Sequence, residues 1–465
     1  MNEMSQPASN PKTIFSRENS LKLILLCFAV WLHAASSLLA ATTLPSAVRE
    51  FGGGNLIGWA FSLYLLGSIL AGSSTGTLVR LTGLRVGLGL AGGLYLVGSM
   101  ICALAPDMNI VLAGRFCQGI GGGYLVALAY VAIRQWFDSA LLPKVLAMVS
   151  AIWSMSAFAG PMVGGTFATF GNWRMAFVAV AVQAAVFIVL ALVTSPKLAP
   201  PEKAEAPTFP LLRLSLISLS VLAIAFAGAE VELVRSTILC LIALVLFSQA
   251  LRLDSKQKSS RMFPSKPLTL SNPIGAGLLL ILTASIASMS FMVYGPIMLE
   301  TIHEISPLAA GYVIAFESVC WGGAAVIIAW FKKPNEKVLI LLGTGLLNLA
   351  LIGFALMMES GSIWAILAFA GLQGAGFGVM WAFVVKRITE HTRENEADET
   401  ASAIPTMQQV GFAFGAAAAG IVANSFGFGE VVTVAGAQAA AFWIFIAFVP
   451  FSLIAWVAGW RLAQR

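Results

Sequence analysis

Few ionisable side chains fall inside the long apolar runs of this sequence, and those few are the candidates for chemistry. Arg115 begins the pattern Arg-x-x-Gln-Gly-x-Gly. Its spacing places four residues on one helix face: Arg115, Gln118, Gly119 and Gly122. A guanidinium in hydrocarbon needs a partner or a water-filled cavity, and the glycines allow close approach. We therefore favour a role in handling substrate or protons, with an anchor for loop carbonyls as the alternative.

Two more ionisable residues lie in apolar runs. Glu317 stands in mid-run, where a carboxylate is a candidate for binding a proton or a cationic substrate; a hydrogen-bonded structural acid is the alternative. His33 could titrate near neutral pH, or it could pack as a polar side chain. Three neutral side chains could line the same cavity: Gln373, Gln408 and Gln409.

A second glycine-rich run predicts a closely packed helix that also contains a proline. Its small residues and its proline are Gly160, Pro161, Gly164 and Gly165. Gly160 and Gly164 fall on one stripe with Ser156, and we expect Pro161 to bend the helix. Such a helix could rock against a neighbour, although tight packing alone would account for the same residues.

A third run joins two apolar segments and contains Gly76, Arg80, Gly83 and Arg85. The glycines would permit a tight turn at the membrane surface. The arginines could bond carbonyl groups at helix C-termini and so latch the two halves of the protein. We interpret this run as a cytoplasmic gating loop.

The elements that must position these residues are membrane-spanning helices. Of the 465 residues, 58% are hydrophobic and 10% are charged, whereas a soluble domain has about 25% charged residues. Apolar runs of about 20 residues match a hydrocarbon core about 30 Å thick. We predict an all-α integral membrane protein with about fourteen such helices. The expected order is a cytoplasmic tail (1–20), a six-helix bundle (21–194), a cytoplasmic linker (195–210), a central helix pair (211–251), a cytoplasmic basic loop (252–272), a second six-helix bundle (273–460) and a cytoplasmic tail (461–465).

The basic residues predict the orientation of these helices. If the N-terminus is cytoplasmic and the chain crosses fourteen times, only Arg49, Arg174 and Arg235 of the 27 Lys and Arg residues fall in outer loops, and Arg115 lies within a helix. This distribution follows the positive-inside rule and predicts that both termini are cytoplasmic. We expect the protein to lie in the inner (plasma) membrane. Losing the central pair would preserve the parity, so twelve helices is the alternative.

An internal repeat relates the two bundles. The run from Gln118 to Gly123 is similar to the run from Gln373 to Gly378, at an offset of about 255 residues. The same shift relates Gly160 to Gly415. Both copies start on the same side of the membrane, so the repeat is parallel, as in transporters that alternate access to a central cavity.

The Arg-x-x-Gln-Gly-x-Gly run, the Gly-Pro-x-x-Gly-Gly run and the Gly-x-Leu…Gly loop resemble three signature motifs of the major facilitator superfamily. The six-two-six layout resembles its fourteen-helix drug:proton antiporter branch. By this resemblance, Arg115 corresponds to an arginine linked to proton transfer, and Gly160-Pro161 to a motif associated with exporters. The chain has Arg80 where the loop motif usually has an acid, and Ser36 near the usual aspartate of the first helix.

Together these features predict a secondary transporter, best described as a proton-driven exporter of hydrophobic or cationic small molecules. A specific metabolite or siderophore carrier, including an importer, is the alternative, and a channel is a weaker one. We expect no enzymatic activity and no cofactor, with the proton gradient as energy source. The expected partners are a small-molecule substrate and the bilayer, with no nucleic acid, and we expect a monomer.

Overall fold

The computed structural model describes residues 16–138, 141–196, 210–257, 261–331, 334–393 and 396–464. Within these ranges every regular element is a helix. Most of the predicted linker 195–210 and the first fifteen residues of the predicted tail lie outside the described residues.

The helices fall into three groups, which we call the N half, the central pair and the C half. The N half comprises α1 (Arg17–Phe51), the short 3₁₀ helix η1 (Gly54–Leu56), α2 (Ile57–Ala103), α3 (Met108–Trp136), α4 (Leu142–Thr169) and α5 (Arg174–Thr194). The central pair is α6 (Leu211–Ala229) and α7 (Leu233–Ser255). The C half comprises α8 (Pro273–Ile302), α9 (Pro307–Ala329), α10 (Glu336–Met357), α11 (Ile363–Glu390), α12 (Ala397–Ser425), α13 (Val434–Ile446) and α14 (Val449–Ala463).

The prediction of about fourteen spanning helices is confirmed. The described residues contain 13 stretches that are long and apolar enough to cross a membrane, and one of them, Gly54–Ala103, is 50 residues long. That stretch is twice the length of a span, and α2 is interrupted at Gly83, where φ is 72° and ψ is 164°. It therefore crosses twice, whereas α13 and α14 together form one span. The central pair is present, so the twelve-helix alternative is wrong.

Some predicted boundaries are wrong by a few residues. The first helix begins at Arg17, within the predicted tail 1–20. Arg252 belongs to α7 and Arg461 to α14, so the predicted loop 252–272 and tail 461–465 both start too early. The single helix predicted to end at residue 460 is split between Ile446 and Val449, because a proline just after the break has no N–H to donate and would clash with a carbonyl one turn back.

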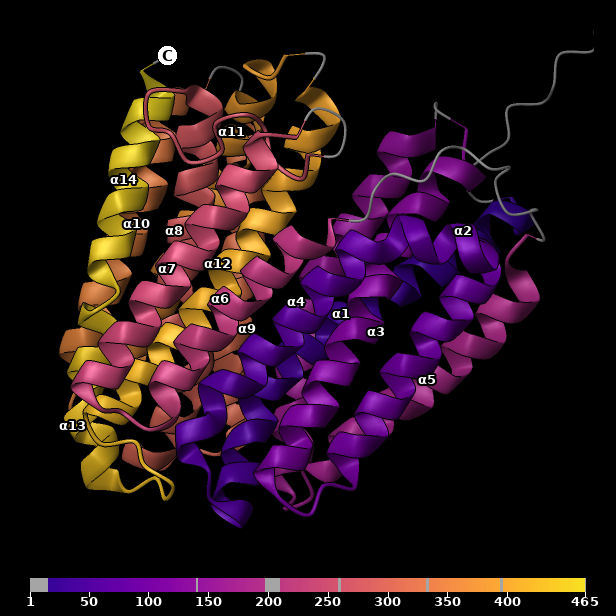
Figure 1. The fold of residues 1–465 in the computed structure, drawn as a ribbon. Coiled ribbons are helices and arrows are strands. Elements are labelled where there is room, and N and C mark those ends of the chain that lie inside the picture. Colours follow the sequence, from indigo (N-terminus) through magenta and orange to yellow (C-terminus); the bar gives the residue numbers. More distant parts are fainter. Residues whose placement is uncertain are drawn as a thin grey trace, which may run out of the picture.

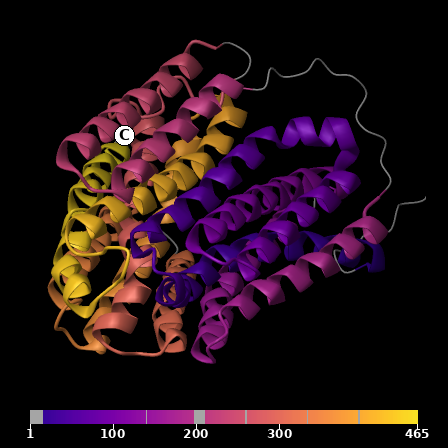
Figure 2. The same ribbon diagram turned by 60° about the horizontal axis from the view of Figure 1, so that its bottom comes forward.

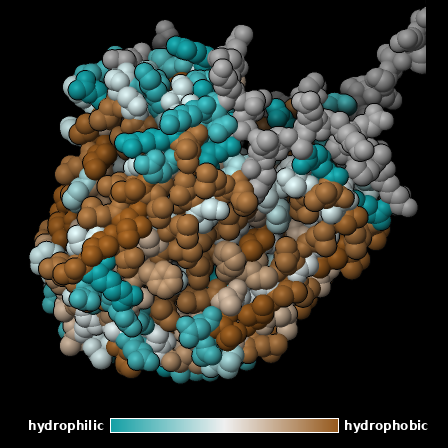
Figure 3. All heavy atoms as spheres, viewed as in Figure 1, coloured by the Kyte–Doolittle hydropathy of each residue, from teal (hydrophilic) through white to brown (hydrophobic). Residues whose placement is uncertain are grey.

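The N half and the C half stand side by side, and the central pair lies along α12 (Figures 1 and 2). Fourteen crossings bring the start of α1 and the end of α14 to the same side of the molecule, which we call the terminal face; the other side is the opposite face. Figure 3 shows an apolar band around the middle, with hydrophilic residues gathered toward the two faces. This is the surface expected of a protein with a bilayer around its middle.

The two halves repeat a close contact at the offset seen in the sequence. A Cβ atom added at Gly119 would lie 2.1 Å from the carbonyl oxygen of Tyr64, and one added at Gly374 would lie 1.9 Å from that of Glu317. Backbone meets backbone at both places, so only glycine fits. Glu317 thus occupies in the C half the place that Tyr64 occupies in the N half.

Replacing Gly119 with Ala should lower the free energy of unfolding by about 1–3 kcal/mol, because the new methyl group overlaps the Tyr64 carbonyl and forces α2 and α3 apart. The matched control is Gly345→Ala in α10, where nothing lies within 4 Å of an added Cβ. Helix propensity should then stabilise that variant slightly. Denaturant titration of purified protein compares the two; equal stabilities would contradict the close contact.

Candidate substrate and proton pathway

The two halves are in contact near the opposite face. Along the seam between α2 and α12, Ser62 Oγ donates a hydrogen bond to the carbonyl of Ala413 at 3.1 Å, and a Cβ added at Gly58 would lie 2.6 Å from the carbonyl oxygen of Ala416. Along the seam between α4 and α9, the backbone N–H of Leu308 donates to Thr169 Oγ1 at 3.1 Å. Both seams are therefore closed on this side.

Toward the terminal face the seam between α2 and α12 separates. A pocket of about 150 Å³ lies between α2, α3 and α12, and its lining includes Ser68, Tyr130 and Gln409. Gly72 also lines this pocket, and nothing lies within 4 Å of a Cβ added there or at Gly76, one turn farther along α2. The halves thus meet at the opposite face and part toward the terminal face, which is the arrangement of one end state of alternating access.

An ion pair joins the halves at the opposite face. Arg49 Nη1 at the end of α1 lies 2.5 Å from Glu300 Oε2 near the end of α8, and the Glu300 side chain is only 2% exposed. Glutamates are usually exposed to solvent, but here packing of α8 against α1 covers Glu300. No pattern in the sequence indicated the packing between α1 and α8 that covers it.

Replacing Arg49 with Met should lower the free energy of unfolding by about 2 kcal/mol, because the buried Glu300 carboxylate loses its charged partner. Adding Glu300→Gln should recover most of that loss, since no charge is then left unpaired. Unfolding titrations of the single and double variants make the comparison. If the double variant were as unstable as Arg49→Met alone, the pair would not be the cause.

Arg115 is fully buried between α1, α2 and α3. Its Nη1 donates to Gln118 Oε1 at 2.6 Å and to the carbonyl of Ser36 at 3.4 Å, and the guanidinium lies 4.1 Å from the centre of the Tyr64 ring. Gln118 donates in turn to Ser99 Oγ at 2.9 Å. No carboxylate pairs with Arg115 among the described residues, so uncharged dipoles and an aromatic ring surround its charge.

Tyr64 connects Arg115 to His33. Its hydroxyl donates to the His33 carbonyl at 2.9 Å and lies 3.0 Å from His33 Nδ1, and the two rings are stacked with centroids 5.5 Å apart. The His33 ring also meets Trp153 of α4 edge-on at 5.8 Å. The predicted residues Arg115, Gln118 and His33 therefore form one buried polar cluster in the N half.

Glu317 and Gln373 form a separate site in the C half. Gln373 Nε2 donates to Glu317 Oε1 at 2.8 Å, which links α9 to α11. Gln373 is fully buried and Glu317 is half-buried. Glu317 forms no ion pair within the described ranges, so a neutral amide is its partner. Of the other predicted cavity residues, Gln409 lines the pocket between the halves, and Gln408 beside it on α12 is half-buried.

The glycines of the Gly-Pro run pack α4 against α1 of its own half and against α9 of the C half. A Cβ added at Gly160 would lie 2.6 Å from the carbonyl oxygen of Ala35 in α1, and one added at Gly165 would lie 2.8 Å from the carbonyl oxygen of Pro307 in α9. Gly164 lies against α1 as well. The Pro161 carbonyl accepts a hydrogen bond from Thr42 Oγ1 at 3.3 Å. α4 is continuous through Pro161, and its glycines put it where α1 and α9 meet.

The predicted gating loop is mostly helix. Gly76 and Arg80 belong to α2, and Gly83 alone has a left-handed φ in this run. Arg85 donates to the carbonyl of Leu192 near the C-terminal end of α5, as expected for an arginine at a helix end. Because α2 and α5 both belong to the N half, this contact does not latch the two halves. The halves are parted at this face, so a latch that forms when the face closes stays a prediction.

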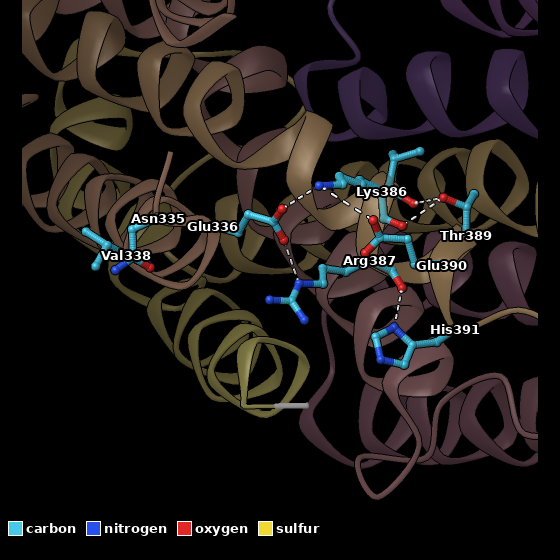
Figure 4. Close-up of polar contacts among 9 residues, drawn as sticks. Asn335, Glu336, Val338, Lys386, Arg387, Thr389, Glu390 and His391 are labelled. Atoms are coloured by element: carbon cyan, nitrogen blue, oxygen red, sulfur yellow. Dashed lines mark hydrogen bonds and ion pairs between the residues drawn. The ribbon is translucent and has the colours of Figure 1, made fainter. Parts of the chain in front are cut away.

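A further ionic cluster at the terminal face was not predicted. Glu336 at the start of α10 accepts from Lys386 Nζ at 2.6 Å and from Arg387 Nε at 2.7 Å, both near the end of α11 (Figure 4). Lys386 also lies 3.5 Å from Glu390. The charges stand on neighbouring helix ends of the C half, so the cluster ties α10 to α11 within that half.

Relatives of this chain carry transporter names. At 27% identity over 95% of this chain and 94% of the relative, it is similar to a protein of Mycobacterium tuberculosis (strain ATCC 25618 / H37Rv) named a probable multidrug-efflux transporter. It is 23% identical to the multidrug transporter protein MdtP of Bacillus subtilis (strain 168), over 88% of this chain and 76% of that one. The multidrug efflux pump SdrM of Staphylococcus aureus (strain N315) is 24% identical over 65% of this chain and 67% of its own length.

Solved structures share the fold at low identity. A mutant of the peptide transporter POT superimposes with a TM-score of 0.70 at 14% identity, covering 95% of both chains. A mutant of the nucleoside transporter NupG superimposes with a TM-score of 0.62 at 13% identity, over 95% of this chain and 99% of the other. The family model described as Major Facilitator Superfamily matches residues 26–360. With two helical halves, a closed face and an opposing gap between them, the chain is a multi-pass membrane transporter that belongs to the major facilitator superfamily.

Proposed function

We propose that this transporter exports hydrophobic or cationic small molecules in exchange for protons. The observation that carries the proposal is Glu317, a half-buried carboxylate inside the helical bundle whose partner is the neutral Gln373. A carboxylate held by an amide rather than by a cation can take up a proton or a positively charged substrate. The names of the multidrug-efflux relatives support the direction and the substrate class.

The distribution of charge supports an orientation. Arg49, Arg174 and Arg235 stand at the opposite face, and nearly all other basic residues that the structure describes stand at or near the terminal face. By the positive-inside rule, the terminal face is cytoplasmic and the protein lies in the inner or plasma membrane. The gap between the halves then opens inward, so a substrate would reach Glu317 from the cytoplasm or from the membrane.

Competition between proton and substrate for Glu317 would couple the transport of one to the transport of the other. A ligand shifts a conformational equilibrium only by the difference between its affinities for the two states. If proton and substrate exclude one another at one carboxylate, each carries the protein through one half of the cycle. The Arg115 cluster would hold a fixed positive charge in the N half that discourages a second cation.

Flux measurements in proteoliposomes test the function. Purified protein is reconstituted, and the uptake of a fluorescent lipophilic cation is followed with and without an imposed pH gradient. Antiport predicts saturable flux that follows the gradient and reverses with it. Saturable flux that ignores the gradient would point instead to a carrier without proton coupling, and non-saturating conductance would point to a channel.

A further inference from the structure

The end of α6 at the opposite face is bonded to both halves. Its last carbonyl groups have no partner within the helix, and side chains from two directions supply donors. Asn424 Nδ2 of α12 donates to the Gly228 carbonyl at 2.6 Å, and Asn55 Nδ2 of η1 donates to the Ala229 carbonyl at 3.2 Å. Asn424 Nδ2 also donates to the Asn55 carbonyl at 3.0 Å. The N half, the C half and the central pair therefore meet at one polar junction.

The contacts of the central pair with the C half run along its length. Near the opposite face, a Cβ added at Gly228 would lie 2.9 Å from the backbone nitrogen of Ile421 in α12. Farther toward the terminal face, Phe247 of α7 meets Phe414 of α12 edge-on, with ring centroids 5.1 Å apart at 86°. The polar and aromatic contacts with the N half are concentrated at the opposite face. Among the described residues these contacts include the hydrogen bond from Asn55 to the Ala229 carbonyl and the edge-on pair of Trp59 and Phe226, with centroids 4.7 Å apart at 89°.

From this asymmetry we infer that the central pair is the third member of the closure at the opposite face, travelling with the C half and releasing Asn55 and Trp59 when that face opens. Opening must separate the start of α2 from the second half of α12, which touch at Gly58 and Ala416 and at Ser62 and Ala413. Asn55 and Trp59 lie just before and at the start of α2, so their contacts with α6 break in the same movement. Each hydrogen bond that opening would break favours the closed state. The inference rests on the alternating access proposed above.

Hydrogen–deuterium exchange tests whether the central pair helps to close the opposite face. It needs neither a substrate nor a proton gradient, so it remains informative if export itself is not observed. The readout is the amide exchange of peptides from the ends of α8 and α12 at the opposite face. Asn55→Ala combined with Trp59→Leu should speed this exchange about three- to tenfold, because the face opens more often. The control is Ser236→Ala, which removes a bond of the same kind from Ser236 Oγ to the Ala227 carbonyl, 2.7 Å long and internal to the central pair. It should leave the exchange unchanged.

Cross-linking tests which half the pair follows, with each variant as its own reference before and after linking. The five native cysteines are first replaced. A short bifunctional thiol reagent then joins Trp59→Cys to Phe226→Cys, or Phe247→Cys to Phe414→Cys. The first link ties the pair to the N half and should slow exchange at the opposite face at least about threefold. The second ties it to the C half and should leave exchange unchanged. Slower exchange with both links, with neither link, or with the second link alone would overturn the inference. Equal exchange rates in the Asn55→Ala/Trp59→Leu variant and in Ser236→Ala would overturn it as well.

Discussion

Replacing Glu317 with Gln should abolish the response of substrate flux to a pH gradient. Glutamine keeps the size of the side chain and can still accept the hydrogen bond that Gln373 donates at 2.8 Å. It carries no exchangeable charge at any ordinary pH, so the proton loses its binding group while the contact between α9 and α11 is preserved. We expect gradient-driven accumulation to fall at least about tenfold, which corresponds to about 1.4 kcal/mol of lost coupling. Downhill flux of a neutral substrate should persist.

The control for this prediction is Glu359→Gln, an exposed acid just beyond α10 that should leave coupling intact. His33→Ala tests the other titratable candidate, which lies against Tyr64 in the N half. If Glu317→Gln retained the full response and His33→Ala lost it, proton binding would belong to the Arg115 cluster. If both retained it, the proton would bind elsewhere.

Sequence reasoning succeeded where one helix decides the outcome. Arg115 and Gln118 are three residues apart, so their contact follows from helical geometry alone. The repeat also located Gln373 as the counterpart of Gln118. Periodicity could not show that Gln373 bonds Glu317, because the two residues are 56 positions apart and belong to different helices. Nor could it show that Tyr64 would link Arg115 to His33.

The failures have a common physical cause, which is packing between elements remote in the chain. Glu300 lies near a helix end, yet α1 covers it and supplies Arg49 from 251 positions away. Arg85 behaves as a C-terminal capping arginine, but the carbonyl that it finds is on α5 and not on the C half. The sequence predicted that Arg85 would bond a carbonyl group at a helix end, but not that the helix would be α5. Residue spacing carries no information on which helices become neighbours.

The last prediction concerns Gly72 and Gly76, two glycines of α2 that face open space. The residues Gly58 and Ser62 that touch α12 at the opposite face continue, at helical spacing, to Gly72 and Gly76. In the observed state nothing lies within 4 Å of a Cβ added at either glycine. When the terminal face closes, α2 must approach α12 there as closely as Gly58 now approaches the carbonyl of Ala416, at 2.6 Å from an added Cβ. Bare backbone at these glycines would permit that approach, and a side chain would not.

Replacing Gly72 and Gly76 together with Leu should therefore reduce transport at least about fiftyfold, a barrier of roughly 2.3 kcal/mol against closure. Stability of the observed state should not fall, because the new side chains enter open space and leucine is the better helix former. The matched control is Gly93→Leu, also with open space around an added Cβ but on the second span of α2. Transport and unfolding are measured on the same preparations. Normal transport by the double variant would mean that α2 and α12 never close on this face, whereas loss of both transport and stability would mean that the glycines are needed for folding. Only lost transport with retained stability identifies the stripe as the surface on which the two halves meet in the second half of the cycle.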